Sequence, residues 1–291
     1  MALTARLGEA VRINGAEGRE AVGAQVVYGV VGLKTHAKLL LVTRREGTPK
    51  RPLLRRYVHL STGNYNPKTA RLYTDLSTLS ADPALTADAA SVFEQLASLG
   101  KTRPLAKLLQ APFTLHSAML SHVNQVARAA RAGRSARIVL KLNALTDTTL
   151  IQALVDAGQA GAEIDLLVRG ACLLPPGLPG RTERIRVRSV VGRFLEHTRI
   201  LYFRWGDGAD DEALYLTSAD WMSRNMFRRI EVAWPVRDAA LRARLIDEGL
   251  VPYLHDTKDA WQQQGDGSYR PLGPNGPSAQ QALMERLRAS R

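Results

Sequence analysis

Cysteine is almost absent from this chain, and long apolar runs are missing altogether. One cysteine, Cys172, stands among 291 residues, which excludes a disulfide framework and a cysteine-rich metal site. No run of 18 apolar residues occurs, and the start at Met1–Thr4 lacks the apolar core of a signal peptide. We therefore expect a cytoplasmic protein with no transmembrane segment, and peripheral association with a membrane stays open.

Negative charge is also in short supply. Lysine and arginine number 40 against 27 aspartates and glutamates, which gives a formal net charge of +13. This excess favours a polyanionic partner such as phosphates or nucleic acid, although solvated surface arginines are the plain alternative. With 45% hydrophobic residues the chain is globular, and its length allows one large domain or two small ones.

Strand-like and helix-like segments alternate, which predicts an α/β fold. Apolar runs predict strands at Gln25–Val31, Leu39–Thr43, Arg56–Leu60, Ala136–Leu142, Ile164–Val168, Ile185–Val191, Ile200–Trp205, Leu214–Leu216 and Ile230–Val236. Helical spacing and caps predict helices at Asp82–Gly100, Ser117–Ala132, Asp147–Ala160, Ala239–Leu254 and Ser278–Arg288. Two segments are expected to be irregular: a basic connection at Arg44–Arg56 and a Gly/Pro-rich linker at Gln263–Pro277.

The chain contains a His-x-basic pair that occurs twice. His36 and Lys38 form the first copy, and His197 and Arg199 form the second about 160 residues later. Residues i and i+2 of a strand share a face, so each histidine projects together with its cation. A lone histidine on a strand is more often structural. Two in repeat register favour phosphoryl chemistry, in which one imidazole attacks phosphorus and the other holds or protonates the leaving oxygen.

Each copy is followed by a hydroxyl-containing turn and then by a carboxylate at equal spacing. Leu60 and Asp75 are 15 residues apart, and Leu216 and Glu231 are also 15 apart. A carboxylate behind a histidine fixes its tautomer, but an ordinary ion pair at the strand end with Arg71 or Arg228 is an equal alternative. In the first turn, Asn64 is suited to orient an imidazole, and a simple turn is the alternative.

Further basic side chains lie on or just after apolar strands. Lys141 and Arg169 are expected to face a polar cleft, because burying a lone charge is costly. Together with Lys38, Arg188 and Arg199 they would neutralise phosphate charge.

These residues together resemble polyphosphate kinase, the histidine-dependent family that makes long-chain polyphosphate from ATP. The resemblance runs from about Thr4 to Val236 and is carried by Val26–Gly29, Gly32–Lys38, His59–Asn66, Thr69–Asp75, Lys141–Asn143, Leu167–Gly170, Ile185–Ser189, Arg193–Arg199 and Ser218–Met222. It implies two phospholipase D-like repeats, each a mixed sheet flanked by helices, with the active site between them. The implied domains are 1–108 and 109–260, followed by a linker and C-terminal helix at 261–291.

The resemblance also implies roles for single residues. His36 matches the histidine that becomes phosphorylated, Tyr73 matches the residue that stacks on adenine, and Arg169 and His197 match contacts to the ATP phosphates. Arg6 matches an arginine at the family's magnesium–phosphate site, where it would hold the phosphates that hold Mg²⁺, since a guanidinium has no lone pair to offer. ATP or ADP and Mg²⁺ are the implied cofactors, and inorganic polyphosphate is the other substrate.

The chain departs from the family in its extent. The family's full chain is more than twice as long, so we expect the N-terminal domain, the helical head domain and the opening of the first catalytic domain to be missing. A separate N-terminal fragment and a second copy of the chain are partners left open. Two rival functions also stay open: a phospholipase D-type phosphodiesterase and a non-catalytic polyphosphate-binding remnant.

Overall fold

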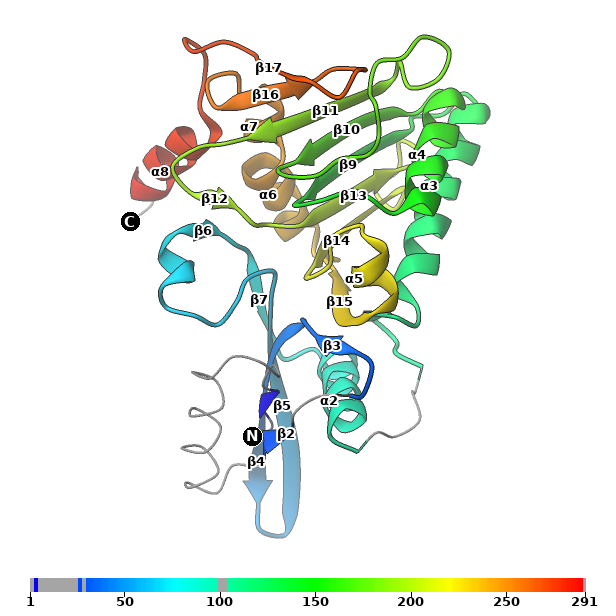
Figure 1. Cartoon of the computed structure of the whole chain (residues 1–291). Coiled ribbons are helices and arrows are strands. Elements are labelled where there is room, and N and C mark those ends of the chain that lie inside the picture. Colours follow the sequence, from blue (N-terminus) through cyan, green and yellow to red (C-terminus); the bar gives the residue numbers. More distant parts are fainter. Residues whose placement is uncertain (1–2, 5–25, 28–29, 99–103, 290–291) are drawn as a thin grey trace.

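A large mixed sheet forms the centre of the molecule (Figure 1). The computed structural model describes residues 3–4, 26–27, 30–98 and 104–289. The sheet has ten strands, in the spatial order β17 (Tyr269–Pro271), β16 (Ala260–Gln263), β11 (Ile185–Val190), β10 (Glu163–Val168), β9 (Arg137–Leu142), β13 (Ile200–Arg204), β14 (Glu212–Thr217), β15 (Arg229–Pro235) and β3 (Lys34–Thr35), with β8 (Leu109–Ala111) also paired to β15.

The central strands are parallel and buried on both faces. β9, β10 and β11 run parallel, while β13, β14 and β15 are each antiparallel to the neighbour before them. Asp147 begins α4 (Thr148–Gln159), the crossover from β9 to β10, by accepting a hydrogen bond from the Leu150 N–H. Side chains alternate across β9, so Leu140 packs with α3 (Leu115–Arg131) and α4 on one face, while Val139 packs on the other with α7 (Val251–His255). The α/β fold expected from the sequence is confirmed.

The first half of the chain builds a smaller sheet. β4 (Lys38–Thr48), β5 (Arg51–Ser61) and β7 (Ser77–Ser80) are antiparallel, and α2 (Pro83–Ser98) packs Val92 against Val58 and Leu60 on one face. The mixed sheet expected in each half is found in the second half, whereas the described three-stranded sheet of the first half is antiparallel. A further pair, β1 (Leu3–Thr4) and β2 (Val26–Val27), is parallel.

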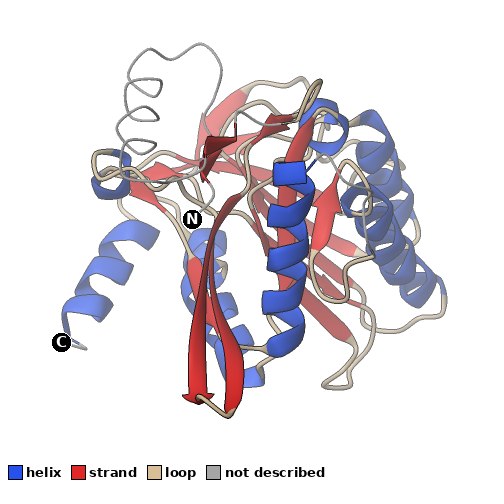
Figure 2. Cartoon of the chain, turned by 90° about the horizontal axis from the view of Figure 1, so that it is seen from below, coloured by secondary structure: helices blue, strands red, loops and turns tan. Residues whose placement is uncertain are grey.

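The basic segment Arg44–Arg56 is a projecting hairpin, and its expectation as an irregular connection was wrong (Figure 2). β4 and β5 pair along their whole length to Thr48 opposite Arg51, which leaves Pro49 and Lys50 as the turn. Pro49 lies in the turn, and Pro52 lies in the part of β5 that pairs with β4 alone, so neither proline interrupts the ladder between β5 and β7. The prolines therefore mark the turn of a hairpin and not an irregular connection between strands.

The linker expected at Gln263–Pro277 is regular structure in its first part only. Residues 272–278 are an irregular connection that leads to the C-terminal helix. β16 pairs with β11, β17 pairs with β16, and Gly267 takes a φ of 85° in the turn between them. Two helices, α6 (Ala239–Gly249) and α8 (Ala279–Ala289), flank this region (Figure 1). Gly265, Gly267 and Pro271 therefore belong to a hairpin that extends the sheet, whereas the later glycines and prolines lie in the connection to α8.

Two short strand pairings join the two halves of the chain. β3 precedes His36 in the first half, yet it pairs with β15 of the second half. Conversely, β6 (Tyr73–Thr74) of the first half pairs with β12 (Leu195–Glu196), which precedes His197 (Figure 1). The remaining described elements are the short helices η1 (Thr69–Arg71) and α5 (Ser223–Phe227). In the part of the chain that the structure describes, no helix has the length and apolar character needed to cross a membrane.

Candidate active site

His36 is placed by a parallel pairing with the strand that carries Glu231. Lys34 lies opposite Arg229 and Thr35 opposite Ile230, so His36 comes next to Glu231. The backbone N–H of His36 donates to the Ile230 carbonyl at 2.9 Å. The imidazole Nδ1 lies 2.9 Å from both carboxylate oxygens of Glu231.

His197 is placed by the same arrangement with the halves exchanged. Leu195 lies opposite Tyr73 and Glu196 opposite Thr74, so His197 comes next to Asp75. Its Nδ1 lies 2.8 Å from Asp75 Oδ1. Each histidine therefore takes its carboxylate from the other half of the chain. Glu231 also has a local cation, because Arg229 Nη1 lies 3.9 Å from its Oε1.

Hydroxyl groups hold both carboxylates. Thr62 donates to Asp75 Oδ1 at 2.9 Å, and Ser218 donates to Glu231 Oε2 at 2.5 Å. Asn225 adds a third contact by donating to Glu231 Oε1 at 2.7 Å, and Glu231 is fully buried. Because a carboxylate only accepts, each imidazole carries its proton on Nδ1 and keeps the lone pair of Nε2.

The two cations differ in their partners. Lys38 Nζ lies 3.0 Å from His36 Nε2 and 3.1 Å from Nδ1. Arg199 makes a two-pronged contact with Asp220, with Nε–Oδ1 and Nη2–Oδ2 both at 3.1 Å, and its Nη1 lies 3.3 Å from His197 Nε2. Arg199 is thus an ion-paired, geometrically fixed cation, whereas Lys38 is a point charge held against the imidazole.

Burial sets the protonation states. It lowers the pKa of Lys38 to about 7, since the charged ammonium loses its water. Burial also lowers the pKa of His36 and of His197, and the hydrogen bonds with Glu231 and Asp75 offset part of this effect. Arg199 lowers the pKa of His36 and Lys38 lowers that of His197, so the two histidines share one electrostatic site. Both imidazoles are neutral at pH 7.

Two of the expected phosphate-binding cations have other partners. Lys141 Nζ lies 2.8 Å from Glu196 Oε2 and 3.1 Å from the centre of the Tyr253 ring, and its side chain is 5% exposed. The open polar cleft expected around Lys141 is therefore not found, because a buried carboxylate and an aromatic ring compensate its charge. Arg188 Nη1 donates to the Leu254 carbonyl.

Of the other expected residues, one lies beside a histidine. Tyr73 is half-buried, with its ring centre 5.1 Å from that of His197. Arg169 follows β10 and donates from Nε to Asn143 Oδ1 at 3.1 Å. Asn64 is exposed, and the imidazole-orienting role expected for it belongs to Glu231 at His36 and Asp75 at His197. Arg6 lies outside the described residues.

Several residues of the site escaped the reading of the sequence. Asp220 occupies the repeat position of Asn64, so alignment of the two turns could have indicated a carboxylate for Arg199. Glu196 precedes His197 directly, but nothing in its neighbours indicates its ion pair with Lys141. Asn225 lies on a one-turn helix with no sequence signal for its contact with Glu231.

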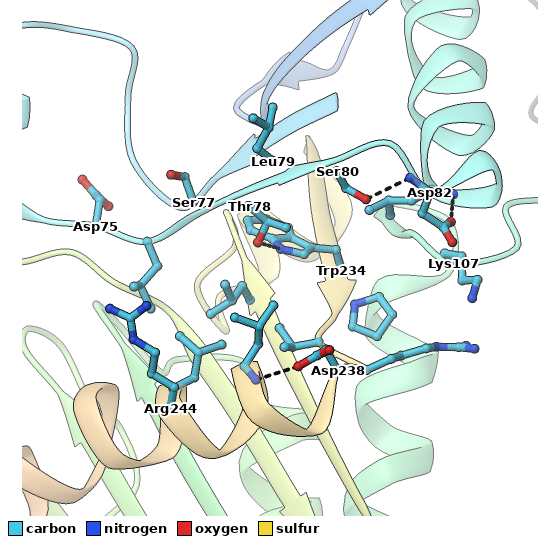
Figure 3. Close-up of a pocket in the computed structure, with 18 of the residues that line it drawn as sticks. Asp75, Ser77, Thr78, Leu79, Ser80, Asp82, Lys107, Trp234, Asp238 and Arg244 are labelled. Atoms are coloured by element: carbon cyan, nitrogen blue, oxygen red, sulfur yellow. Dashed lines mark hydrogen bonds between the residues drawn. The ribbon is translucent and has the colours of Figure 1, made fainter. Parts of the chain in front are cut away.

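A cavity of about 750 Å³ opens beside Asp75, between β7 and α6 (Figure 3). Trp234 forms part of its wall and donates from Nε1 to Thr78 Oγ1 at 3.0 Å. Neither His36 nor His197 lines it, and Asp75, the partner of His197, is the residue that the cavity shares with the pair of histidines.

Magnesium was expected to accompany the phosphates. Among residues 3–4, 26–27, 30–98 and 104–289, no group of three or more His, Cys, Asp or Glu side chains is placed to hold a metal ion. The carboxylates of Asp75 and Glu231 face imidazoles. These residues do not fit a protein-held Mg²⁺.

Comparison with known proteins places this geometry in a family. Residues 1–102 match the family description "Polyphosphate kinase C-terminal domain 1", and residues 108–282 match "Polyphosphate kinase C-terminal domain 2". The chain is 54% identical over 268 residues to polyphosphate kinase of Burkholderia multivorans, covering 92% of this chain and 39% of that protein. It is 51% identical over 285 residues to polyphosphate kinase of Paraburkholderia phytofirmans, covering 98% of this chain and 41% of the relative.

A solved structure agrees over the whole chain. The crystal structure of polyphosphate kinase from Porphyromonas gingivalis superposes with a TM-score of 0.90 at 32% identity, covering 100% of this chain and 44% of that one. The chain thus spans about two fifths of the length of the curated relatives it matches. Since two domain descriptions cover nearly all of its residues and relatives share about half of them, the chain belongs to the polyphosphate kinase family.

Proposed function

We propose that this chain transfers the γ-phosphoryl group of ATP reversibly to polyphosphate, through a phosphohistidine at His36. The observation that carries this proposal is the crossed arrangement at the site. Two neutral imidazoles, each held by a carboxylate from the other half, share one buried site with two cations. One histidine can then attack phosphorus while the second faces the leaving oxygen.

In the first step, the Nε2 lone pair of His36 forms a bond to the γ-phosphorus. The bond from that phosphorus to the β,γ-bridging oxygen breaks, and its electron pair leaves with ADP. Glu231 holds the Nδ1 proton and stabilises the positive charge that the ring gains. Lys38 and Arg199 neutralise the phosphoryl oxygens, and His197, backed by Asp75, stabilises the leaving oxygen.

In the second step, a terminal oxygen of polyphosphate attacks the phosphohistidine. The new P–O bond lengthens the polyphosphate chain by one unit, and the electron pair of the broken N–P bond returns to Nε2. His36 is thereby restored as a neutral imidazole, and attack by ADP in place of polyphosphate reverses the reaction. Positioning and charge neutralisation supply most of the catalysis in transfers of this kind.

The remaining expectations from the sequence belong to this proposal. Tyr73, beside His197, would stack on adenine, and Arg169 would contact the ATP phosphates, with Mg²⁺ arriving as part of the nucleotide substrate. Lys141 contacts Glu196, and Arg188 contacts the Leu254 carbonyl. These two cations would therefore act on the phosphates indirectly, through the residues that they contact. An N-terminal polyphosphate kinase fragment and a second copy of the chain are the partners proposed, and a cytoplasmic location suits the use of ATP.

Labelling with γ-labelled ATP tests the nucleophile. We expect His36 to form an acid-labile, alkali-stable phosphoamidate, and His36→Ala to form none. His59→Ala is the matched control, because His59 lies on neighbouring β5 and contacts Tyr65, so it should keep the label. If His36→Ala takes up label at the wild-type rate, the nucleophile is another residue.

Dependence on ATP and turnover of polyphosphate separate the rival functions. A phospholipase D-type phosphodiesterase would cleave phosphodiesters without ATP, and a binding remnant would retain polyphosphate without turnover. Tyr73 beside His197 favours a nucleotide substrate over a lipid, because an aromatic ring there can stack on a base.

A further inference from the structure

The C-terminal helix reaches the strand that delivers His197. Gln280, in the first turn of α8, is 4% exposed. Its Oε1 accepts from the Phe194 N–H at 2.8 Å, and its Nε2 donates to the Phe194 carbonyl at 2.9 Å. The side-chain amide therefore pairs with the Phe194 backbone as a neighbouring strand would.

Gln280 also contacts the residue that directly precedes His197. Its Nε2 donates to Glu196 Oε1 at 2.5 Å. The other oxygen of Glu196 accepts from Lys141 at 2.8 Å and from Thr74 at 2.9 Å. Glu196 thus joins α8, β9 and β6 at one buried carboxylate, one residue before the imidazole.

The base of α8 is itself anchored. Asp256, fully buried, accepts from the Ala279 N–H at 2.7 Å and from the Asp259 N–H at 2.8 Å. Gly192 makes room for the Gln280 amide, since a Cβ there would lie 2.6 Å from Gln280 Oε1. These contacts fix the Gln280 side chain on both sides.

Among the described residues, no equivalent side-chain contact holds the segment before the first histidine. Thr35 occupies the position of Glu196 in the repeat, and its Oγ1 is buried without a hydrogen-bond partner among the described residues. Each histidine directly follows a two-residue strand and does not lie within a strand as the sequence predicted. β3, before His36, is held by backbone pairing with β15, whereas β12, before His197, is held by pairing with β6 and by the side-chain contacts of α8. Within the described residues, the two histidines are therefore held by different kinds of contact.

We propose that Gln280 is a positioning residue for His197, and that α8 contributes to the catalytic site through this side chain. By holding Phe194 and Glu196, the amide keeps the His197 imidazole against Asp75 and facing the phosphoryl group. Its catalytic consequence rests on the proposed function, but its effect on the His197 ring does not. Displacement of a reacting group by about 1 Å can cost on the order of a hundredfold in rate.

The test compares Gln280→Ala with Gln281→Ala in the full chain. Gln281 is the adjacent, exposed residue of α8 and loses the same amide group. Imidazole NMR would follow the Nδ1–H of His197 and of His36, and polyphosphate synthesis would be measured with ATP affinity. We expect Gln280→Ala to shift the His197 signal and its tautomer balance, with turnover falling about tenfold to a hundredfold and ATP affinity nearly unchanged. Gln281→Ala should change neither.

A second variant keeps the test decisive if Gln280→Ala folds poorly. Gly192→Ala places a Cβ against the same amide and should give the same His197 signature. An unchanged His197 spectrum, with turnover per folded molecule intact in both variants, would overturn the positioning role. If wild-type His36 takes up no label, the proposed function fails, while the NMR comparison still decides whether Gln280 positions His197.

Discussion

At the residue scale, Lys38 and Arg199 occupy equivalent positions beside the two histidines but differ in ionisation. Burial lowers the pKa of Lys38 to about 7, whereas a guanidinium keeps its charge throughout the working range of pH. His36 titrates below its ordinary value of 6.5, also because of burial. The free enzyme therefore has its nucleophile neutral and its lysine charged only in a window near neutral pH.

This window predicts a bell-shaped pH dependence for the rate of His36 labelling at low ATP. On the acid side, at pH values below 6.5, the labelling rate should decrease as His36 gains a proton. On the alkaline side, above pH 7, it should decrease by up to about tenfold per pH unit as Lys38 loses its charge. Lys38→Arg should abolish the alkaline fall and keep the acid one. An alkaline limb that survives in Lys38→Arg would assign it to another group.

At the element scale, α2 is tied to the connection between the two halves by one side chain. Asp88, buried in α2, accepts backbone hydrogen bonds from Ala106 at 3.0 Å, Lys107 at 2.6 Å and Leu108 at 2.8 Å. Hydrogen bonds to a charged group contribute more than neutral ones, and buried N–H groups left without an acceptor are costly. Asp88 therefore anchors the entry into the second half.

We predict that Asp88→Ala lowers the free energy of unfolding by about 3 kcal/mol or more, because three N–H groups lose their acceptor. Denaturant titration would measure it. Asp156→Ala, on the exposed face of α4, removes a carboxylate that accepts a hydrogen bond from Gln152. It should stay within about 0.5 kcal/mol of wild type. Equal effects of the two substitutions would contradict the anchoring role of Asp88.

Elements of regular length were predictable, and the short ones were not. Asp147 and the apolar spacing after it indicated α4, which the structure confirms almost residue for residue. The two-residue strands β3, β6 and β12 carry no periodicity, so the sequence could not indicate them. The hairpin and the C-terminal strands were misjudged because glycine and proline mark turns within a sheet as well as linkers between domains.

At the scale of the whole molecule, the charge of +13 is unevenly placed. The hairpin β4–β5 carries exposed cations at and near its tip, including Arg45, Lys50 and Arg51, and projects away from the large sheet (Figure 2). A polyanion bound there would displace counterions, so its affinity depends on salt.

We predict that polyphosphate binding weakens by about a hundredfold or more over a fourfold rise in salt. Replacing Arg45, Lys50 and Arg51 together by alanine should reduce both the affinity and the salt slope. Matched removal of Arg128, Arg131 and Arg134, exposed at the end of α3, should change them less. Fluorescence anisotropy with labelled polyphosphate measures both, and a flat salt dependence would exclude a polyanion partner.

The sequence by itself determined the repeat, the α/β class and the two histidines with their cations, because these depend on composition and local spacing. Only the tertiary structure decided which carboxylate faces which imidazole. Glu231 stands 195 residues from His36, and Asp75 stands 122 residues from His197. Parallel pairing of two-residue strands from opposite halves fixes both contacts, and no local pattern encodes a register between segments so far apart.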